Sequence, residues 1–434
     1  MKRLVLVASA IALLAAGCTS PSSRPPLRIG AIYPLSGSQG PGGIDEFSGV
    51  RLATAFVNEG GGVDGRLVQL YPMDVAGGDA APAAVQALAG DGVRIVLGSY
   101  GSTISEPAAA AATRRGMLFW ETGAVGGMVG WNSGSSGWGF GSGYGATAEA
   151  RPNGLFFRVA PTGSTLGRSA ISFVTDELAP RLHRAPSTLR YAVAYVDDVY
   201  GEAVEQGALA ELGTRGLTVA GTFGYPAVGA DMRRVAAQIA RAHPDVLFVA
   251  AYLQDGVALR RAIVREHVPL VANIGTSSSY CMPQFGHRLG ADALGVFASD
   301  KPDADSIGTQ GLAPDAVALL ERARAAYRDR YGAEISAPAL AGFSAAWALL
   351  HDVLPRASAL TPSAIAAAAR STRILDGGLP NGSGLAFASA RSPDAGTNLR
   401  AATVIWEWTG IDHRAVVWPP RFATTSIRPI SPSP

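Results

Sequence analysis

Short apolar runs alternate along the chain with stretches in which apolar residues recur every three or four positions. Phe47, Val50 and Val57, with Thr54 on the same face, predict a helix that ends at the glycines of 60–62. Strands are expected at 28–35, 66–71, 94–98 and 117–120, with further helices at about 80–89 and 104–115. Strands that alternate with helices predict parallel pairing in a doubly wound α/β sheet.

The same alternation resumes in the second half of the chain. Strands are expected at 190–196, 217–223, 246–250 and 269–274, and helices between them at about 201–213, 232–241 and 255–266. Later helices are expected at about 314–331, 337–354 and 363–369, and two late strands near 385–388 and 401–408. The pattern predicts two doubly wound parallel-sheet lobes joined by a multi-crossover hinge, with a ligand cleft between them.

The expected domain boundaries follow from this alternation. The first lobe is expected at 27–160, the second at 161–295, segments that return to the two lobes at 296–417, and a proline-rich tail at 418–434. A glycine-rich stretch with interleaved aromatic residues, at 126–145, predicts a long surface loop.

The N-terminus indicates export. Two cations, a short apolar run and a small residue follow one another, as in a secretory signal at 1–17. Residues 14–18 resemble the lipobox of lipoprotein signal peptides, except for Ala15, where that pattern prefers Leu. By this resemblance Cys18 takes the lipid after cleavage, and the Ser- and Pro-rich 18–26 is a flexible tether. The folded body is therefore expected outside the cytoplasm, on a membrane.

The composition limits the kinds of molecule that the protein is expected to bind. The 434 residues carry 36 basic and 34 acidic side chains, a formal charge of +2, without the basic stripe that nucleic acid requires. Lysine is found only at 2 and 301, a scarcity that we attribute to genome composition rather than to chemistry. With Cys18 lipidated, Cys281 has no partner for a disulfide and is expected to be buried.

The sequence lacks recognisable catalytic patterns. It contains no G-x-S-x-G and no Walker A motif, and its six histidines are not spaced as metal ligands on a helix. Residues 141–146 match a loose dinucleotide fingerprint, but they neither follow a predicted strand nor open a helix. We therefore expect a binding protein without cofactor or metal.

Candidate ligand groups follow the predicted strands, because a parallel sheet binds ligands beyond its carboxyl ends. Ser102 and Thr103 precede the helix at 104–115, where free N–H groups and the helix dipole suit a carboxylate. The alternative is that they only cap the helix. Tyr200, Tyr252 and Ser277 follow strands of the second unit, although a tyrosine there can equally lie on the lobe surface.

Several segments together resemble the extracytoplasmic solute-binding proteins of ABC importers, in the leucine/isoleucine/valine-binding protein family, which has the type I periplasmic binding fold. The resemblance covers nearly all of the chain after the signal, and its segments are 34–37, 45–49, 97–103 with Glu106 and Pro107, 197–202 and 404–408. No single segment identifies the family, but the order and spacing of the segments together are specific for it.

The resemblance implies roles for individual residues. Ser102, with Thr103 beside it, falls where the family holds the carboxylate of an amino acid. Gly123 and its neighbour Ala124 fall where the backbone contacts the ligand, whereas Val125 replaces a threonine of the family pattern. Tyr200 and Tyr252 match aromatic positions on the second lobe.

One departure concerns the ligand's ammonium group. The glutamate with which the family pairs that ammonium aligns near Thr276 and Ser277, which are uncharged. A buried ammonium needs an anionic partner, and either Glu121 or Asp255 is a candidate, with a solvated or helix-terminal charge as the alternative. If neither serves, the ligand is expected to be an organic acid, an amide or an aromatic compound.

The favoured function is a lipid-anchored receptor that closes two lobes over a small polar ligand, a branched-chain amino acid or related carboxylate or amide, and delivers it to an ABC permease. A sensory binding lipoprotein on the same fold is the alternative, and no motif separates the two. An extracytoplasmic hydrolase is a third hypothesis, but the sequence shows no recognisable set of nucleophile, base and orienting group.

Overall fold

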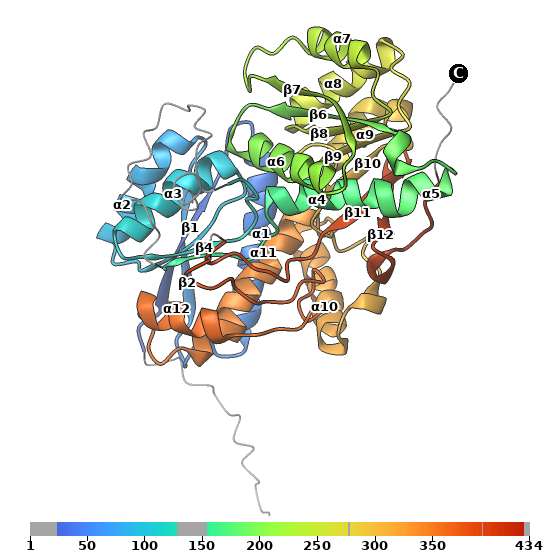
Figure 1. Cartoon of the computed structure of the whole chain (residues 1–434). Coiled ribbons are helices and arrows are strands. Elements are labelled where there is room, and N and C mark those ends of the chain that lie inside the picture. The colour runs from blue at the N-terminus through green and yellow to red at the C-terminus, as the bar shows by residue number, and fades with distance from the viewer. Residues whose placement is uncertain (1–23, 128–153, 277, 393, 429–434) are drawn as a thin grey trace, which may run out of the picture.

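The computed structural model of the chain describes residues 24–127, 154–276, 278–392 and 394–428. It contains two separate sheets, each flanked by helices, and Figure 1 shows them as two bodies joined through the C-terminal third of the chain. The two-lobe α/β architecture predicted from the sequence is confirmed.

The first sheet consists of five parallel strands in the order β2-β1-β3-β4-β5. Its strands are β1 (Leu27–Tyr33), β2 (Val68–Asp74), β3 (Ile95–Gly98), β4 (Leu118–Glu121) and β5 (Phe156–Arg158). The helices of this part are α1 (Gly40–Glu59), α2 (Ala81–Gly90) and α3 (Ser102–Arg114). β3 and β4 are buried along their whole length, as expected for central strands covered on both faces.

The second sheet has seven strands in the order β12-β11-β10-β9-β8-β6-β7. They are β6 (Arg190–Val196), β7 (Thr218–Tyr225), β8 (Val246–Ala250), β9 (Ala272–Thr276), β10 (Phe297–Asp300), β11 (Val404–Gly410) and β12 (His413–Trp418). Its helices are α4 (Gly163–Phe173), α5 (Ala179–Arg181), α6 (Val199–Thr214), α7 (Met232–Ala242), α8 (Leu253–Arg265) and α9 (Pro283–Leu289). The pairings of β10 with β11 and of β11 with β12 are antiparallel, and the others are parallel.

Three further helices, α10 (Pro314–Tyr331), α11 (Ala337–Trp347) and α12 (Pro362–Ser371), follow β10 and lie beside the first lobe (Figure 1). The stretch Ala337–Arg356 is long and apolar enough to cross a membrane, but 83% of its most apolar 18-residue window is buried inside the protein. It is therefore a core helix, packed along α1. The chain thus returns to the first lobe after β10 and to the second sheet at β11.

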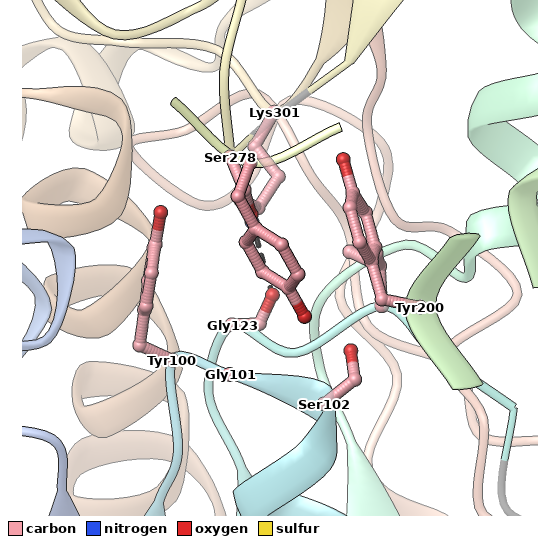
Figure 2. Close-up of a pocket in the computed structure, with 9 residues that line it drawn as sticks. Tyr100, Gly101, Ser102, Gly123, Tyr200, Ser278 and Lys301 are labelled. Atoms are coloured by element: carbon pink, nitrogen blue, oxygen red, sulfur yellow. Dashed lines mark hydrogen bonds between the residues drawn. The ribbon is translucent and has the colours of Figure 1, made fainter. Parts of the chain in front are cut away.

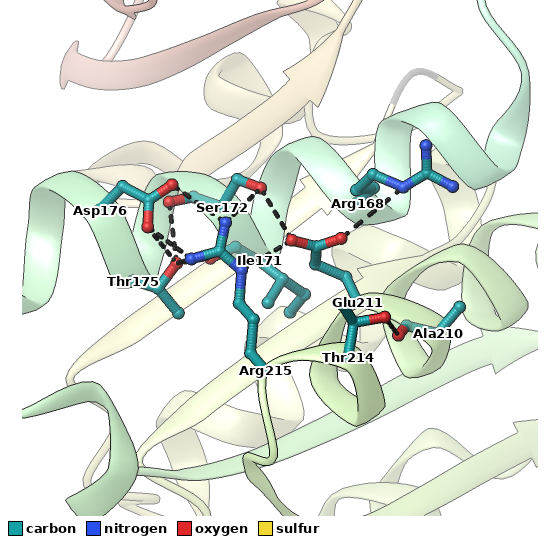
Figure 3. A network of polar contacts seen from close by, with 9 residues as sticks. All are labelled: Arg168, Ile171, Ser172, Thr175, Asp176, Ala210, Glu211, Thr214 and Arg215. Atoms are coloured by element: carbon teal, nitrogen blue, oxygen red, sulfur yellow. Dashed lines mark hydrogen bonds and ion pairs between the residues drawn. The ribbon is translucent and has the colours of Figure 1, made fainter.

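In the second lobe, α4 packs closely on α6, the helix that carries Tyr200. A Cβ on Gly167 would lie 2.3 Å from the Val204 carbonyl oxygen, so glycine permits this approach. At the far end Arg215 is an ion-pair centre, with Nη1 2.5 Å from Asp176 and Nε 2.6 Å from Glu211 (Figure 3). The neighbouring guanidinium lowers the pKa of Asp176. Close packing rather than these half-exposed pairs fixes α6 in place.

Some predicted elements differ from the structure. The strand expected at 385–388 forms only isolated bridges, to Ile374 and Asn398. The tail expected from 418 begins inside β12, whose last residue Trp418 pairs with β11. α4, β5, β10 and β12 are absent from the predicted elements. As expected, Cys281 is buried and is a free thiol.

Candidate ligand-binding site

A pocket lies where the carboxyl ends of strands from both sheets meet (Figure 2). Its first-lobe residues follow β3 and β4, and its second-lobe residues follow β6, β8, β9 and β10. The lining consists of Tyr100, Gly101, Ser102, Gly123, Val125, Tyr200, Tyr252, Ser278 and Lys301. This is the position that the fold predicts for a ligand, at the carboxyl edges of open parallel sheets.

On the first lobe, the N-terminus of α3 faces the pocket. Gly101 is the N-cap, with no side-chain cap, and its carbonyl accepts from the N–H groups of Ile104 and Ser105. The preceding first-turn N–H groups have no acceptor within the helix. Ser102 is 5% exposed, and its Oγ accepts from the Gly126 N–H at 2.9 Å. Its hydroxyl proton can therefore be donated into the pocket, beside the positive end of the helix.

On the second lobe, two tyrosines form an aromatic wall. The rings of Tyr200 and Tyr252 lie with their centroids 5.3 Å apart. The Tyr200 hydroxyl lies 2.5 Å from Thr276 Oγ1, and the Tyr252 hydroxyl donates to Asp198 Oδ2 at 2.8 Å. Asp198 also caps α6, accepting from the N–H groups of Tyr200 and Gly201. One carboxylate thus fixes both the helix and the orientation of the ring at 252.

Tyr100 forms the opposite wall and reaches across to the second lobe. Its hydroxyl is hydrogen-bonded to Ser278 and lies 4.0 Å from the Met282 sulfur. Burial raises the pKa of this phenol well above its usual value, so it is a neutral donor and acceptor. The contact holds the lobes close together at the pocket.

Lys301 directly follows β10 and is 3% exposed. Its Nζ donates to the Gly123 carbonyl oxygen at 2.9 Å and lies 3.7 Å from Asp300 Oδ1. The second sheet thereby supplies an ammonium group to the loop after β4 of the first sheet. Among the described residues that line the pocket, this is the charged one.

Glu121, at the end of β4, is fully buried and does not line the pocket. Its Oε1 accepts from the N–H groups of Gly123 and Ala124, at 3.0 and 2.8 Å. Burial raises its pKa to about 8, against the opposing effect of Arg158. The structure thus places Glu121 outside the lining, because backbone donors of its own loop take this carboxyl.

A second buried glutamate, Glu46 of α1, lies behind the same loop. The Thr122 hydroxyl donates to its Oε1 at 2.6 Å and is 2.7 Å from the Tyr33 hydroxyl. A Cβ on Gly123 would meet Glu46 Oε2 at 1.7 Å, so any other residue at 123 would require the Glu46 carboxyl to move. Burial raises the pKa of Glu46 to about 7, and Lys301 opposes this shift.

Asp255, the other predicted partner for an ammonium, is also outside the lining. Its Oδ2 accepts from the Tyr252 N–H at 3.2 Å and from the Tyr225 hydroxyl at 2.7 Å. It therefore caps α8, the alternative that the sequence left open. Burial raises its pKa.

The remaining predicted residues divide into those on the pocket and those beside it. Ser102, Gly123, Tyr200 and Tyr252 line it. Thr103 lies behind, with its Oγ1 accepting from the Gln39 amide at 3.2 Å, and Ala124 is buried under the loop. Ser277 and Cys18, the residue predicted to take a lipid, lie outside the described residues.

The sequence did not point to Tyr100, Ser278 or Lys301. Tyr100 lies inside a segment that carried the resemblance, two residues before Ser102, the first predicted residue of the site. Lys301 was missed because β10 was not predicted, and because we assigned the scarcity of lysine no functional meaning. A single internal lysine in a chain otherwise rich in arginine was the available signal.

Comparisons with known proteins identify the family and the fold of the chain. Residues 26–404 match a family model described as periplasmic binding protein. A Leu/Ile/Val-binding protein homolog of Brucella abortus is 26% identical over 390 residues, which cover 88% of each chain.

Solved structures share the fold at low identity. A leucine-binding protein from Thermotoga maritima has a TM-score of 0.71 at 16% identity, covering 90% of this chain and 97% of that one. A solute-binding protein of an ABC transporter from Rhodopseudomonas palustris, in complex with 3,4-dihydroxybenzoic acid, has a TM-score of 0.66 at 16% identity, covering 88% and 92%.

Proposed function

Because the chain belongs to the periplasmic binding protein family, we propose that it is a lipid-anchored, extracytoplasmic receptor that delivers a small carboxylate ligand to an ABC permease. Its two lobes form the type I periplasmic binding fold. The family consists of solute-binding proteins rather than enzymes, and its location is extracytoplasmic. Transport by this chain, its permease partner and the lipid on Cys18 are parts of the proposal.

One observation carries the proposal. The pocket joins a helix N-terminus with a serine hydroxyl, on the first lobe, to two tyrosines of the second lobe. Such an arrangement binds a carboxylate by hydrogen bonds and dipole and holds an uncharged body against aromatic rings. Since its walls come from different lobes, a ligand that contacts both favours the closed arrangement.

The proposed ligands are branched-chain amino acids or related carboxylates and amides. Names of similar proteins support this range: one is a leucine-binding protein, and another was solved with an aromatic acid. The range is wide because a type I fold positions its ligand by a few side chains, while the scaffold stays the same.

A melting experiment tests the proposal. The full chain, purified in mild detergent, is heated with leucine, isoleucine, valine, their 2-oxo acids, aliphatic amides and aromatic acids in separate samples. A ligand at a hundred times its dissociation constant stabilises the fold by about 2.7 kcal/mol. We expect at least one carboxylate to raise the melting temperature, and a panel without any shift contradicts the proposal.

Two substitutions locate the site. Ser102→Ala removes the hydroxyl that faces the pocket and is expected to weaken binding by roughly 1 to 3 kcal/mol. Thr103→Ala is the matched control, one residue along the same helix turn, and should leave affinity unchanged, because Thr103 faces Gln39. Equal affinities of the two variants would exclude Ser102 from the site.

A further inference from the structure

The described residues that line the pocket include one basic side chain and no carboxylate. Lys301 is the charged residue among the described lining residues, and the other side chains that reach it are hydroxyls, rings and Val125. An ammonium taken from water into such a pocket finds no carboxylate to pair with, which costs several kcal/mol. A carboxylate finds an ammonium, a serine hydroxyl and a helix N-terminus.

Three acids close to the pocket already have donors of their own, and a fourth, Asp300, is paired with Lys301. Asp198 is held by two N–H groups of α6 and by the Tyr252 hydroxyl, and Asp255 by the start of α8 and Tyr225. Glu121 is held by the loop after β4. Turning any of these acids toward the pocket uncaps a helix or leaves a buried N–H without an acceptor, and both are unfavourable.

The carbonyl that faces the pocket is also occupied. Gly123 O accepts from Lys301 Nζ, so the protein's own ammonium takes the acceptor that a ligand amine needs. A lysine has three N–H donors, and within the described residues this is the hydrogen bond that its ammonium makes, since Asp300 is 3.7 Å away. Donors remain for a ligand anion.

The rest of the lining suits an uncharged body. Tyr100, Tyr200 and Tyr252 present rings, and Val125 presents methyl groups at the position where the family pattern has a threonine. The hydroxyls of the three tyrosines are engaged with Ser278, Thr276 and Asp198, so they hold the rings in place.

Within the proposed function, we propose that the pocket takes small monocarboxylic acids that carry no amino group, such as 2-oxo acids and aromatic acids, and that Lys301 is the residue that selects them. The carboxylate lies between the α3 N-terminus and the lysine, and the body lies among the tyrosines.

The charge of the surrounding cluster is consistent with this choice. Two cations, Arg158 and Lys301, are buried with three carboxyls, Glu46, Glu121 and Asp300. Burial raises the pKa of all three carboxyls, to about 7 for Glu46 and about 8 for Glu121. When the two glutamates are protonated, two cations face one anion, and a ligand carboxylate completes the balance.

The test compares ligands that differ in one group. The three compounds share one alkyl body. Leucine carries both a carboxylate and an ammonium, 4-methyl-2-oxopentanoate carries the carboxylate alone, and 3-methylbutylamine carries the ammonium alone. Titration calorimetry on the full chain in detergent should give the oxo acid at least about tenfold higher affinity than leucine, and no binding of the amine. Benzoate reports whether an aromatic body is accepted as well.

Lys301→Gln assigns the selection to the lysine. The variant should lose at least about tenfold in affinity for the oxo acid. Leucine loses the same carboxylate contact but also the repulsion between its ammonium and the lysine, so it should lose less affinity and the preference for the oxo acid should narrow. Asp300→Asn combined with Lys301→Gln removes both members of the buried pair and serves if the single variant does not fold. An unchanged preference in a folded variant contradicts the role of Lys301.

The outcomes separate the two proposals. If leucine binds more tightly than its oxo acid, the chain remains a solute-binding protein, and the inference about the ligand class is overturned. If no compound of the wider panel binds, the proposed function itself fails.

Discussion

Buried carboxyl groups hold the loop that forms the floor of the pocket. Glu121 accepts from two N–H groups of this loop, and Glu46 accepts from Thr122. Both side chains are fully buried, and each has one oxygen without a hydrogen-bond partner in the described part of the chain. A protonated carboxyl costs less there than a charged one, which is why burial raises both pKa values.

The stability of the fold should therefore depend on pH. A glutamate with a folded pKa of about 7 binds a proton more tightly in the folded than in the unfolded chain, so its contribution is present below about pH 4.5 and is lost as pH rises through 7. The free energy of unfolding falls between pH 5 and pH 8, and Glu46→Gln should make this decrease smaller by on the order of 3 kcal/mol.

Urea unfolding at several pH values measures this effect. Glu59→Gln is the control, since Glu59 ends the same helix with its side chain exposed and pairs with Arg322 at the surface. A Glu46→Gln variant whose pH profile matches that of the unsubstituted protein contradicts the assignment of the proton to Glu46.

Residues of the pocket lining were predictable where a strand end and a helix start were both visible. Ser102, Tyr200 and Tyr252 each follow a predicted strand and line the pocket, and their contact with a ligand stays a prediction. Glu121 lies outside the lining, because position along a strand does not reveal which backbone N–H groups a carboxylate meets. Lys301 depends on a contact with Gly123, which is 178 positions away in the sequence and invisible to local patterns.

Among the elements, α1 and α11 pack closely along each other in the first lobe. A Cβ on Gly49 would lie 1.9 Å from the Ala339 carbonyl oxygen, and one on Gly342 would lie 2.1 Å from the Glu46 carbonyl oxygen. The two backbones approach each other at glycines, and this close packing holds Glu46 behind the pocket.

Gly49→Ala should destabilise the protein by roughly 1 to 3 kcal/mol, because the new methyl group overlaps a backbone that cannot move alone. Gly213→Ala in α6 is the control, since a Cβ there meets nothing within 4 Å, and alanine favours a helix by about 0.5 to 1 kcal/mol over glycine. Thermal unfolding of both variants tests this. A Gly49→Ala variant as stable as Gly213→Ala would show that the helices are not in close contact.

Elements with clear termini were predicted well, and short ones were not. α10 has the predicted bounds of 314–331, because it begins with Pro314 and ends before Gly332. α4 was missed because its glycines, serines and threonine favour a helix only weakly, although its apolar residues recur at helical spacing, and β5 and β10 have only three and four residues. Without β10 the lysine that follows it could not be placed.

At the scale of the whole molecule, the pocket exists because the lobes touch. Lys301 donates a hydrogen bond to the loop after β4, and Tyr100 contacts Ser278 and Met282. Atoms of both lobes therefore meet around the ligand position. The two-lobe architecture was predictable from the alternation of strands and helices. The distribution of the last third of the chain between the lobes was not, since it depends on long-range packing such as that of α11 on α1.

The most direct test is a crystal structure of the protein with 4-methyl-2-oxopentanoate. We expect the ligand between the closed lobes, with its carboxylate about 3 Å from both Ser102 Oγ and Lys301 Nζ and its alkyl group among Tyr100, Tyr200 and Tyr252. A ligand bound elsewhere contradicts the account, as does a carboxylate turned away from Lys301.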